Sequence, residues 1–536
     1  MADRSLDSSG MTRRGALAVG GVALGGGLLA ACGGGGSGSS SGTTARQAGS
    51  PASGTQAIRK GGVMRVGVSG GGSADTLDPA KANSDADIQR SYVLYEALAQ
   101  RDPDYKLEMV MAEEIEAGPK GASWTVRLRD GIEFHNGKTM TADDVLYTWK
   151  RILDPKFPNV AVGRLKTIDM KRTKKLDART IRVHLVAPNV EWPENLGGSF
   201  TRIVPEGFDP KSPVGTGAFK FKSFKPGERS TFVKFENYWR SGQPYLDQLD
   251  YIDFADDTSK VNALVGGQVD AITSLPPSQI AAVKGNPKLK LLIGPTGNWQ
   301  PFTMRVDAAP FNDVRVRQAF RLIVDRKQMI DQALGGQGDV ANDMYARFDR
   351  SAASLPQREQ DVEQAKSLLK AAGRSDLTVE LVTSPIFVGV VEAATVFAQQ
   401  AKAAGVNVKV RKVDGGTFFG PQYLKWPFAQ DFWLSNLFIP QATQCSLPTS
   451  PLNETHWDDP TFTKLVADIS AELDDAKRAQ LTLEAQKILY DKGGYIVWSF
   501  SNTIDATSAK VGGLRPSKYG AALGNAGFNA AGFVAT

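Results

Sequence analysis

Residues 377–410 read LTVELVTSPIFVGVVEAATVFAQQAKAAGVNVKV, and the changing hydrophobic period along this stretch indicates the class of fold. Residues 377–383 alternate like a strand, 388–404 have the pattern of a helix, and 406–410 predict a second strand. Gly405 is typical of the residue that ends a helix. A strand, a helix and a strand of these lengths predict a parallel, right-handed β-α-β unit, so we expect an α/β fold.

Similar patterns extend to both sides of this unit. Residues 63–69 alternate like a strand, and 85–100 carry apolar side chains at helical spacing. Residues 314–334 predict one long amphipathic helix, and the apolar stretch 495–504 predicts a strand that returns to the first half. Because single hydrophobic cores stop growing beyond ~250–300 residues, a chain of 536 residues should fold as at least two α/β lobes.

The first sixty residues differ in composition from the rest and predict export. Arg13-Arg14 precede a weakly apolar run, which is typical of a signal peptide over residues 1–31 and resembles a twin-arginine signal, with Sec export left open. Leu29-Ala30-Ala31-Cys32 resembles a lipobox, in which Cys32 receives the lipid. Residues 32–59 are rich in glycine and serine and predict a flexible tether. We therefore expect a lipoprotein anchored to the outer face of the bacterial cytoplasmic membrane.

The charge of the chain argues against a nucleic-acid partner, and its cysteine content argues against a disulfide. The formal net charge is +6 over 536 residues, and the charges of both signs are interspersed, so a nucleic-acid surface is poorly supported. Once Cys32 is lipidated only Cys445 remains, and no intramolecular disulfide can form. We expect Cys445 to be packed inside the protein and the fold to depend on burial of its cores.

No pattern of residues predicts catalysis. Gly67-Val68-Ser69-Gly70-Gly71 matches a nucleophile elbow, but glycines follow Ser69 where that motif needs a helix, so an exported serine hydrolase is the weaker alternative. The three histidines, His135, His184 and His456, are too far apart in sequence to predict a metal site. We expect a protein without enzymatic activity, cofactor or metal.

Aromatic side chains gather in the second half of the chain, near the ends of predicted strands, where α/β folds bind ligands. At least half of them should be ordinary core residues. Trp433 and Asn436, on one strand-to-loop segment, are the preferred pocket residues. The candidate ligand-binding residues are Trp299, Phe302, Thr383, Phe387, Trp433, Asn436, Phe438, Asn453 and Trp457.

Five ordered stretches that span the body of the chain share the motifs of one known family. They read WTVRLRDGIEFHNG (124–137) with TADDV (141–145), PVGTGAF (213–219), NYW (237–239) with LD (246–247), GQVD (267–270), and PFNDVRVRQAF (310–320) with DR (325–326). On these residues the chain resembles solute-binding protein family 5, which contains the oligopeptide, dipeptide and nickel receptors of ABC transporters.

The resemblance implies a two-lobe α/β fold of the type II periplasmic-binding-protein kind, which closes over a solute by hinge motion. It implies lobe 1 from residues 60–102, 207–296 and 495–536, an extra subdomain of lobe 1 from residues 103–206, and lobe 2 from residues 297–494. The expected protein is a monomeric receptor that delivers a small solute to separate ABC permease and ATPase subunits. A surface-tethered sensor with the same fold is the alternative.

The resemblance also bears on the solute. Peptide-binding members hold the peptide ammonium with an aspartate on the loop after the strand that matches residues 428–437. Here that loop reads FIPQ (438–441), without a carboxylate, although Asp431 could be shifted into reach, and Arg305 stands where the family commonly has asparagine. Because a buried ammonium needs a counter-charge, a less charged sugar-like or opine-like solute is favoured over a peptide. Its hydrogen-bonding partners would be Asn436, Gln441 and Asn453.

Overall fold

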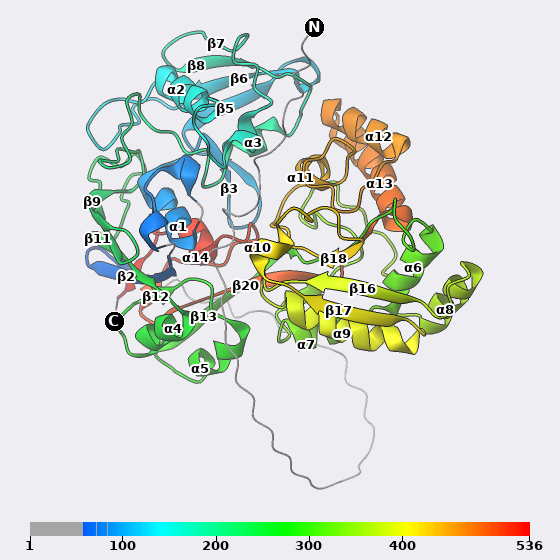
Figure 1. Ribbon diagram of the computed structural model, residues 1–536. Coiled ribbons are helices and arrows are strands. Elements are labelled where there is room, and N and C mark those ends of the chain that lie inside the picture. The colour runs from blue at the N-terminus through cyan, green and yellow to red at the C-terminus, as the bar shows by residue number, and fades with distance from the viewer. Residues whose placement is uncertain (1–56, 71, 83, 536) are drawn as a thin grey trace, which may run out of the picture.

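The computed structural model describes residues 57–70, 72–82 and 84–535. The predicted signal peptide, the lipobox with Cys32 and most of the predicted tether lie outside these residues. Figure 1 shows two bodies side by side, each built around its own mixed sheet, with helices packed against the sheets. In the part of the chain that the structure describes, no helix is both long enough and apolar enough to cross a membrane.

The first body is built around a large mixed sheet of the order β13-β20-β12-β2-β11-β10-β9. β2 is parallel to β11 and to β12, while β9, β10 and β11 form antiparallel pairs. These strands are β2 (Val63–Ser69), β9 (Phe219–Lys225), β10 (Arg229–Lys234), β11 (Gln248–Phe254), β12 (Ala271–Ile272), β13 (Leu289–Trp299) and β20 (Ser499–Ser508). Its helices are α1 (Asp85–Leu94), α4 (Asp257–Val265), α5 (Ile280–Lys284) and α14 (Ala522–Ala526).

The predicted helix over 85–100 is too long. α1 begins at Asp85, after its N-cap residue Ser84, but ends at Leu94, because the backbone of Tyr95 is extended. The buried hydroxyl of Tyr95 donates to the carbonyl of Leu77, which holds the chain in this turn. The following residues form β3 (Ala99–Arg101), paired with β4 (Leu107–Met109), and this pair leads into the next sheet.

A second, four-stranded sheet of the order β5-β6-β8-β7 lies at one end of the first body. Three tryptophans, Trp124, Trp149 and Trp192, are buried in its own hydrophobic core. Thr141 and Asp144 form a capping box at the start of α2. The elements are β5 (Ala112–Ala117), β6 (Ser123–Leu128), β7 (Lys174–Lys175), β8 (Thr180–His184), α2 (Ala142–Ile152), α3 (Val162–Leu165) and the 3-10 helix η5 (Trp192–Leu196).

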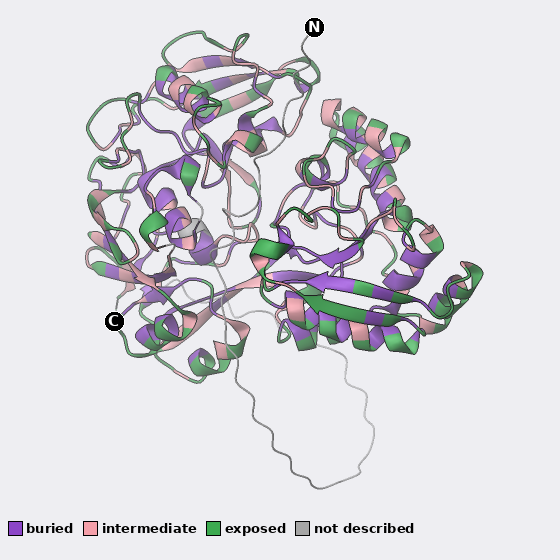
Figure 2. Cartoon of the chain, viewed as in Figure 1, coloured by how far each residue is buried: buried purple, intermediate pink, exposed green. Residues whose placement is uncertain are grey.

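The second body contains a five-stranded sheet of the order β17-β16-β18-β14-β19. The predicted β-α-β unit is confirmed, because β16 (Thr378–Thr383) and β17 (Asn407–Lys412) are parallel and α9 (Val390–Ala403) connects them. Figure 2 shows that the middle of this sheet is buried. The other strands are β14 (Phe302–Met304), β18 (Phe428–Gln430) and β19 (Tyr495–Ile496), and the longer helices around them are α8 (Val362–Ala371), α11 (Phe438–Cys445), α12 (Pro460–Ala471) and α13 (Asp475–Lys492).

The prediction of one continuous helix over residues 314–334 is wrong, although both parts of this range are helical. The chain forms two helices, α6 (Val314–Ile323) and α7 (Arg326–Ala333), with a break between them. Val324 and Asp325 are extended at the break, and the Asp325 carboxylate accepts a hydrogen bond from the backbone N–H of Gln328. Aspartate stabilises a helix start in this way, so α7 begins anew at Arg326.

Two long antiparallel strands, β13 and β20, connect the two bodies. Their register shifts between Pro295 and Asn298, and just beyond this shift Trp299 pairs with Trp433 of the second body. The apolar strand predicted over 495–504 is divided, since β19 joins the second sheet and β20 joins the first. We call the body containing β2 lobe 1 and the body containing β16 lobe 2, and residues 103–206 keep the name extra subdomain.

Candidate functional site

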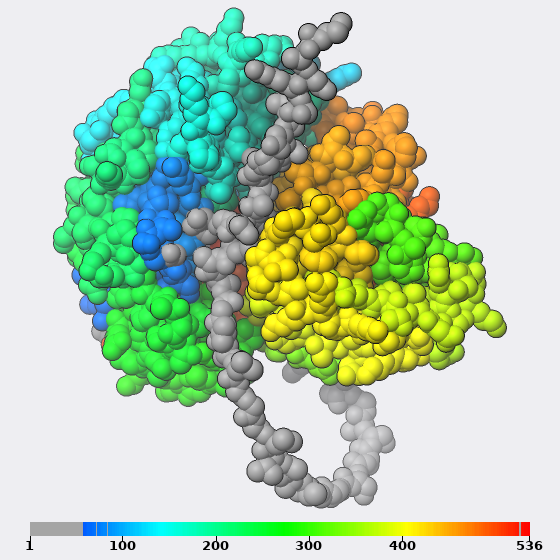
Figure 3. All heavy atoms as spheres, viewed as in Figure 1, coloured from blue at the N-terminus to red at the C-terminus, as the bar shows by residue number. Residues whose placement is uncertain are grey.

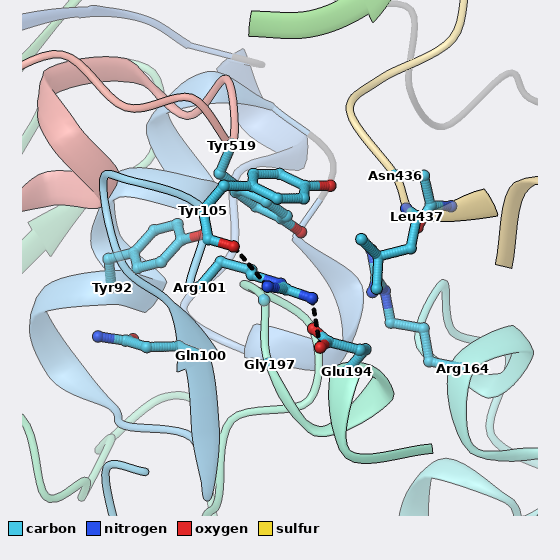
Figure 4. A pocket seen from close by; sticks show the side chains of 11 residues that line it. Tyr92, Gln100, Arg101, Tyr105, Arg164, Glu194, Gly197, Asn436, Leu437 and Tyr519 are labelled. Atoms are coloured by element: carbon cyan, nitrogen blue, oxygen red, sulfur yellow. Dashed lines mark hydrogen bonds and ion pairs between the residues drawn. The ribbon is translucent and has the colours of Figure 1, made fainter. Parts of the chain in front are cut away.

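A small cavity of about 30 Å³ lies where the lobes meet. In Figure 3 the first body is coloured blue to green and the second body green through yellow to orange, and the two lie side by side. Lobe 1 and its extra subdomain provide nine of the lining residues, and lobe 2 provides Asn436 and Leu437 (Figure 4). The residues from lobe 1 are Tyr92, Gln100, Arg101, Tyr105, Arg164, Glu194, Gly197, Gly198 and Tyr519.

Three tyrosines line one side of the cavity. Tyr92 comes from α1, Tyr105 from the turn between β3 and β4, and Tyr519 from the segment before α14. The rings of Tyr105 and Tyr519 are 6.1 Å apart, and Tyr105 also lies 5.4 Å from the ring of Phe348 in lobe 2. Burial raises the pKa of Tyr92 to about 12, so its phenol stays protonated near neutral pH. The tyrosines therefore offer flat rings and hydroxyl groups to a bound molecule.

An ion pair between Arg101 and Glu194 closes the floor of the cavity (Figure 4). Arg101 also donates to the backbone oxygen of Tyr105. Burial raises the pKa of Glu194 from 4.5 to about 7, and Arg101 and Arg350 oppose this shift. The positive charge of Arg101 is thus already matched by a carboxylate within the protein.

Arg164 extends from α3 toward Asn436 and Leu437 in lobe 2 (Figure 4). Among residues 57–70, 72–82 and 84–535, no carboxylate forms an ion pair with it. Its guanidinium lies beside Gly198, where an added Cβ would be 3.8 Å from Cζ of Arg164. Opposite it, the Asn436 amide oxygen accepts only from the N–H of Leu437 in its own segment.

Arg202 lies behind the tyrosines and is 2% exposed. Its guanidinium is 4.3 Å from the ring centre of Tyr92, and Nη1 lies 3.4 Å from both the Tyr95 carbonyl and the Gln100 side-chain oxygen. No described carboxylate lies within ion-pair distance of it, and burial lowers its pKa. Arg202 therefore supports two lining residues and places a second positive charge next to the cavity.

Further acidic groups lie where the extra subdomain faces lobe 2. Burial, with smaller contributions from Asp349 and Glu194, raises the pKa of Glu191 well above its usual range, which favours its neutral form. The Asp349 carboxylate of lobe 2 accepts from the backbone N–H of Phe438 and of Ser351, so it caps the start of α11. Neither of these two carboxylates lines the cavity.

Of the nine predicted ligand-binding residues, only Asn436 lines the cavity. Most of the others are side chains packed within lobe 2. Trp299 stacks between Tyr345 and Trp433, at ring distances of 5.3 and 6.0 Å. The remaining candidates have the following places: Phe302 packs on Phe397, Thr383 donates to Gln430, Phe387 stacks on Phe432, Phe438 lies against Tyr345, Asn453 bonds the loop around Trp457, and Trp457 packs on Phe462.

Two of the three side chains expected to bind a neutral solute, Asn453 and Gln441, bond within the protein itself, and so does Asp431, the acid that could have been shifted into reach. Asn453 donates to the carbonyls of Leu447 and Trp457, and the buried Gln441 contacts the thiol of Cys445. Asp431 is 1% exposed and accepts from the hydroxyl of Tyr423, so it is not shifted into the cavity. The structure thus places none of these three side chains at the contact between the lobes.

Ser69 lies at the end of β2 without the arrangement of a nucleophile elbow. Its hydroxyl accepts a hydrogen bond from Lys260, at 2.9 Å, and the same ammonium is paired with Asp257, also at 2.9 Å. A lysine held by a carboxylate is poorly suited to remove a proton from serine. Within the described ranges, no three His, Cys, Asp or Glu side chains are grouped as metal ligands.

Comparison with known proteins gives a consistent result. The family model "Bacterial extracellular solute-binding proteins, family 5 Middle" matches residues 106–442. The chain is 25% identical to the glutathione-binding protein GsiB of Pectobacterium atrosepticum, with 83% of this chain and 90% of that protein covered. It is 26% identical to the periplasmic oligopeptide-binding protein OppA of Salmonella typhimurium, over 80% and 85% of the two chains.

Solved structures share the fold. The ABC transporter substrate-binding protein CtaP of Listeria monocytogenes superposes with a TM-score of 0.79 at 21% identity, covering 89% of this chain and all of that one. This likeness confirms the two-lobe α/β architecture that the sequence resemblance implies.

Proposed function

Because the chain belongs to family 5 of the bacterial extracellular solute-binding proteins, we propose that it holds its solute in the cavity between lobe 1 and lobe 2. Its function is that of an extracytoplasmic receptor, which captures a small solute and delivers it to the permease of an ABC importer. The observation that carries the location of the site is that residues from both lobes line one cavity.

Hinge motion is required for this role. A cavity of about 30 Å³ has room for roughly two or three water molecules, so no peptide or sugar fits while the lobes are in contact. The irregular register of β13 and β20 between Pro295 and Asn298 is a natural place for the backbone to bend. Separation of the lobes would expose the three tyrosines and Arg164, and closure would bury the solute among them.

The protein has no reaction of its own in this proposal. Its relatives of known activity bind solutes. The pairing of Lys260 with Asp257 leaves Ser69 without a base to activate it. A fluorophosphonate probe should therefore label the native protein no faster than a Ser69→Ala variant.

Export and anchoring follow from the first residues of the sequence. Arg13-Arg14 and the lipobox ending at Cys32 predict a lipoprotein, whose tether leaves the two lobes free to reach a permease in the same membrane. Labelling of cells with a fatty-acid analogue should mark the protein, and a Cys32→Ser variant should lose that label and leave the membrane fraction.

The experiment that tests the receptor role is a thermal-shift screen of the chain against peptides, glutathione, sugars and opines, followed by calorimetry on each hit. A ligand present at ~100 times its Kd stabilises the folded state by about 2.7 kcal/mol, which shifts the melting temperature measurably. A saturable one-to-one interaction, together with loss of uptake of the same solute when the gene is deleted, would support the proposal. Uptake unchanged by the deletion would contradict the transport role.

A further inference from the structure

We propose that the solute carries a carboxylate, which binds the guanidinium of Arg164 in the cavity between the lobes; this inference rests on the proposed receptor function. The starting observation is that Arg164 points from α3 at the contact with lobe 2, where Asn436 and Leu437 face it. Its charge is unmatched among the described residues, whereas Arg101, its neighbour in the cavity, is paired with Glu194.

The charges around the cavity favour an anion. Arg202 adds a second positive charge behind Tyr92, also without a described carboxylate at ion-pair distance. On the negative side, Glu194 is occupied by Arg101, and Asp349 by the backbone of α11. Arg164 is half-buried where the lobes are in contact and has no carboxylate partner among the described residues, so an anionic group of the solute can bind it as the lobes close.

The geometry favours a carboxylate over a phosphate. One guanidinium makes two parallel hydrogen bonds to a planar carboxylate, and Arg164 is the single unpaired guanidinium among the lining residues. A phosphate dianion would need a second free cation in contact, and Arg101 is already engaged. The rings of Tyr92, Tyr105 and Tyr519 lie next to this group and can cover an apolar or planar part of the same solute.

Among the residues that line the cavity, those of lobe 2 carry no charge. Asn436 is neutral, so no carboxylate of lobe 2 competes with the solute for Arg164, and none is available there for a solute ammonium. This arrangement differs from the neutral, sugar-like ligand favoured by the sequence. The residues that line the cavity favour a solute with a free carboxylate.

The test uses the full chain and matched acid and amide probes: hippurate and hippuramide, and N-acetyl-dialanine and its amide. Melting temperatures and calorimetric titrations are measured for each pair, with inorganic phosphate as a further probe. We expect at least one acid to bind one-to-one and to raise the melting temperature, and its neutral partner to bind at least tenfold more weakly.

Substitutions then assign the effect to Arg164. Arg164→Met keeps an unbranched apolar side chain without the guanidinium and should weaken binding of the acid by roughly tenfold to a hundredfold, since hydrogen bonds to charged groups are worth about 1.5–3 kcal/mol. Arg164→Lys retains the charge but cannot make the two parallel hydrogen bonds. Its affinity for the acid should lie between those of the wild type and Arg164→Met. Arg172→Met removes an exposed arginine of the same subdomain and should change the affinity less than twofold.

The outcomes are distinct. Equal binding of acid and amide, unchanged affinity in Arg164→Met, or stronger stabilisation by phosphate would each overturn the carboxylate assignment. Binding of the amides alone would leave the receptor function intact and overturn this inference only. If no probe stabilises the chain, the carboxylate inference is contradicted, whereas the location of the site is tested separately by locking the lobes together. Melting of each variant without ligand shows that it is folded, and Arg164→Lys replaces Arg164→Met if the latter is not.

Discussion

The two walls of the cavity are built from different parts of the lobes. Lobe 1 places the short elements β3, α3 and η5 there, which carry charged side chains, and its three tyrosines come from α1 and from two loops. Lobe 2 contributes the loop before α11, while its aromatic stack of Trp299, Trp433 and Tyr345 is buried behind that loop. The comparison teaches that an accumulation of tryptophans can support a binding surface from within, while the groups that select the solute come from the opposite lobe.

The largest expected effect concerns the aromatic stack of lobe 2. Trp299→Ala removes a ring that is 1% exposed and contacts Tyr345, Trp433 and Tyr495. Such a truncation costs about 3–5 kcal/mol of the free energy of unfolding. Chemical denaturation measures it, and Tyr519→Phe, a change in the lobe 1 wall, serves as the control with an effect of about 1 kcal/mol or less. Equal losses in the two variants would erase the proposed division between the walls.

Breaking a buried charge cluster inside lobe 2 should lower the free energy of unfolding by a similar amount. Asp343 is buried and accepts hydrogen bonds from Arg326 and Arg358. Burial alone would raise the pKa of Asp343, but the two arginines reverse this and lower it. Asp343→Asn leaves two cations with one neutral partner, and breaking a buried pair costs about 3–5 kcal/mol.

The matched control for this variant is Asp331→Asn, which breaks an exposed pair with Lys327 on α7. Surface ion pairs contribute about 0–1 kcal/mol, so this control should unfold almost like the wild type. A comparable loss in both variants would show that burial does not decide the effect.

The lowered pKa of Asp343 means that its contribution to stability is lost as the pH falls. Acids with a raised pKa in lobe 1 should have the opposite effect. Glu194 has a pKa of about 7 in the folded protein and 4.5 as its ordinary value, so between these values the folded state binds more protons than the unfolded state. Stability therefore falls as the pH rises from 4.5 to 7. Glu194→Gln should reduce this slope, measured as melting temperature against pH. Asp505 and Glu191 have raised pKa values too and should keep part of it.

The smallest change concerns Cys445, which is buried in α11 as the sequence analysis expected. Burial raises the pKa of its thiol to about 12, so almost no thiolate exists at neutral pH. An alkylating reagent should leave the native protein unmodified and react once denaturant is added. Rapid labelling under native conditions would mean that the α11 region opens readily.

The β-α-β unit could be predicted because its strands and helix differ in hydrophobic period, and that signal is local. The break at Asp325 was missed because α6 and α7 continue the same apolar pattern across it. Glu194 and Arg164 resemble ordinary surface residues in the sequence. They belong to the site only because the extra subdomain folds against lobe 2, and no local pattern contains that contact. Asn436 was found because it lies on a segment that leads from a predicted strand into a loop, where α/β folds bind ligands.

The most direct test of the account is to lock the two lobes together. The backbone N–H of Val190 in the extra subdomain donates to the carbonyl of Ser470 in lobe 2, at 2.9 Å, so a Val190→Cys/Ser470→Cys pair should form a disulfide across the closed cavity. The solute with the strongest saturable effect in the screen is titrated into the oxidised and the reduced protein, with each single variant as a control. We predict that the reduced protein binds like the wild type and that the oxidised protein does not bind. Equal affinity in both states would contradict a site between the lobes.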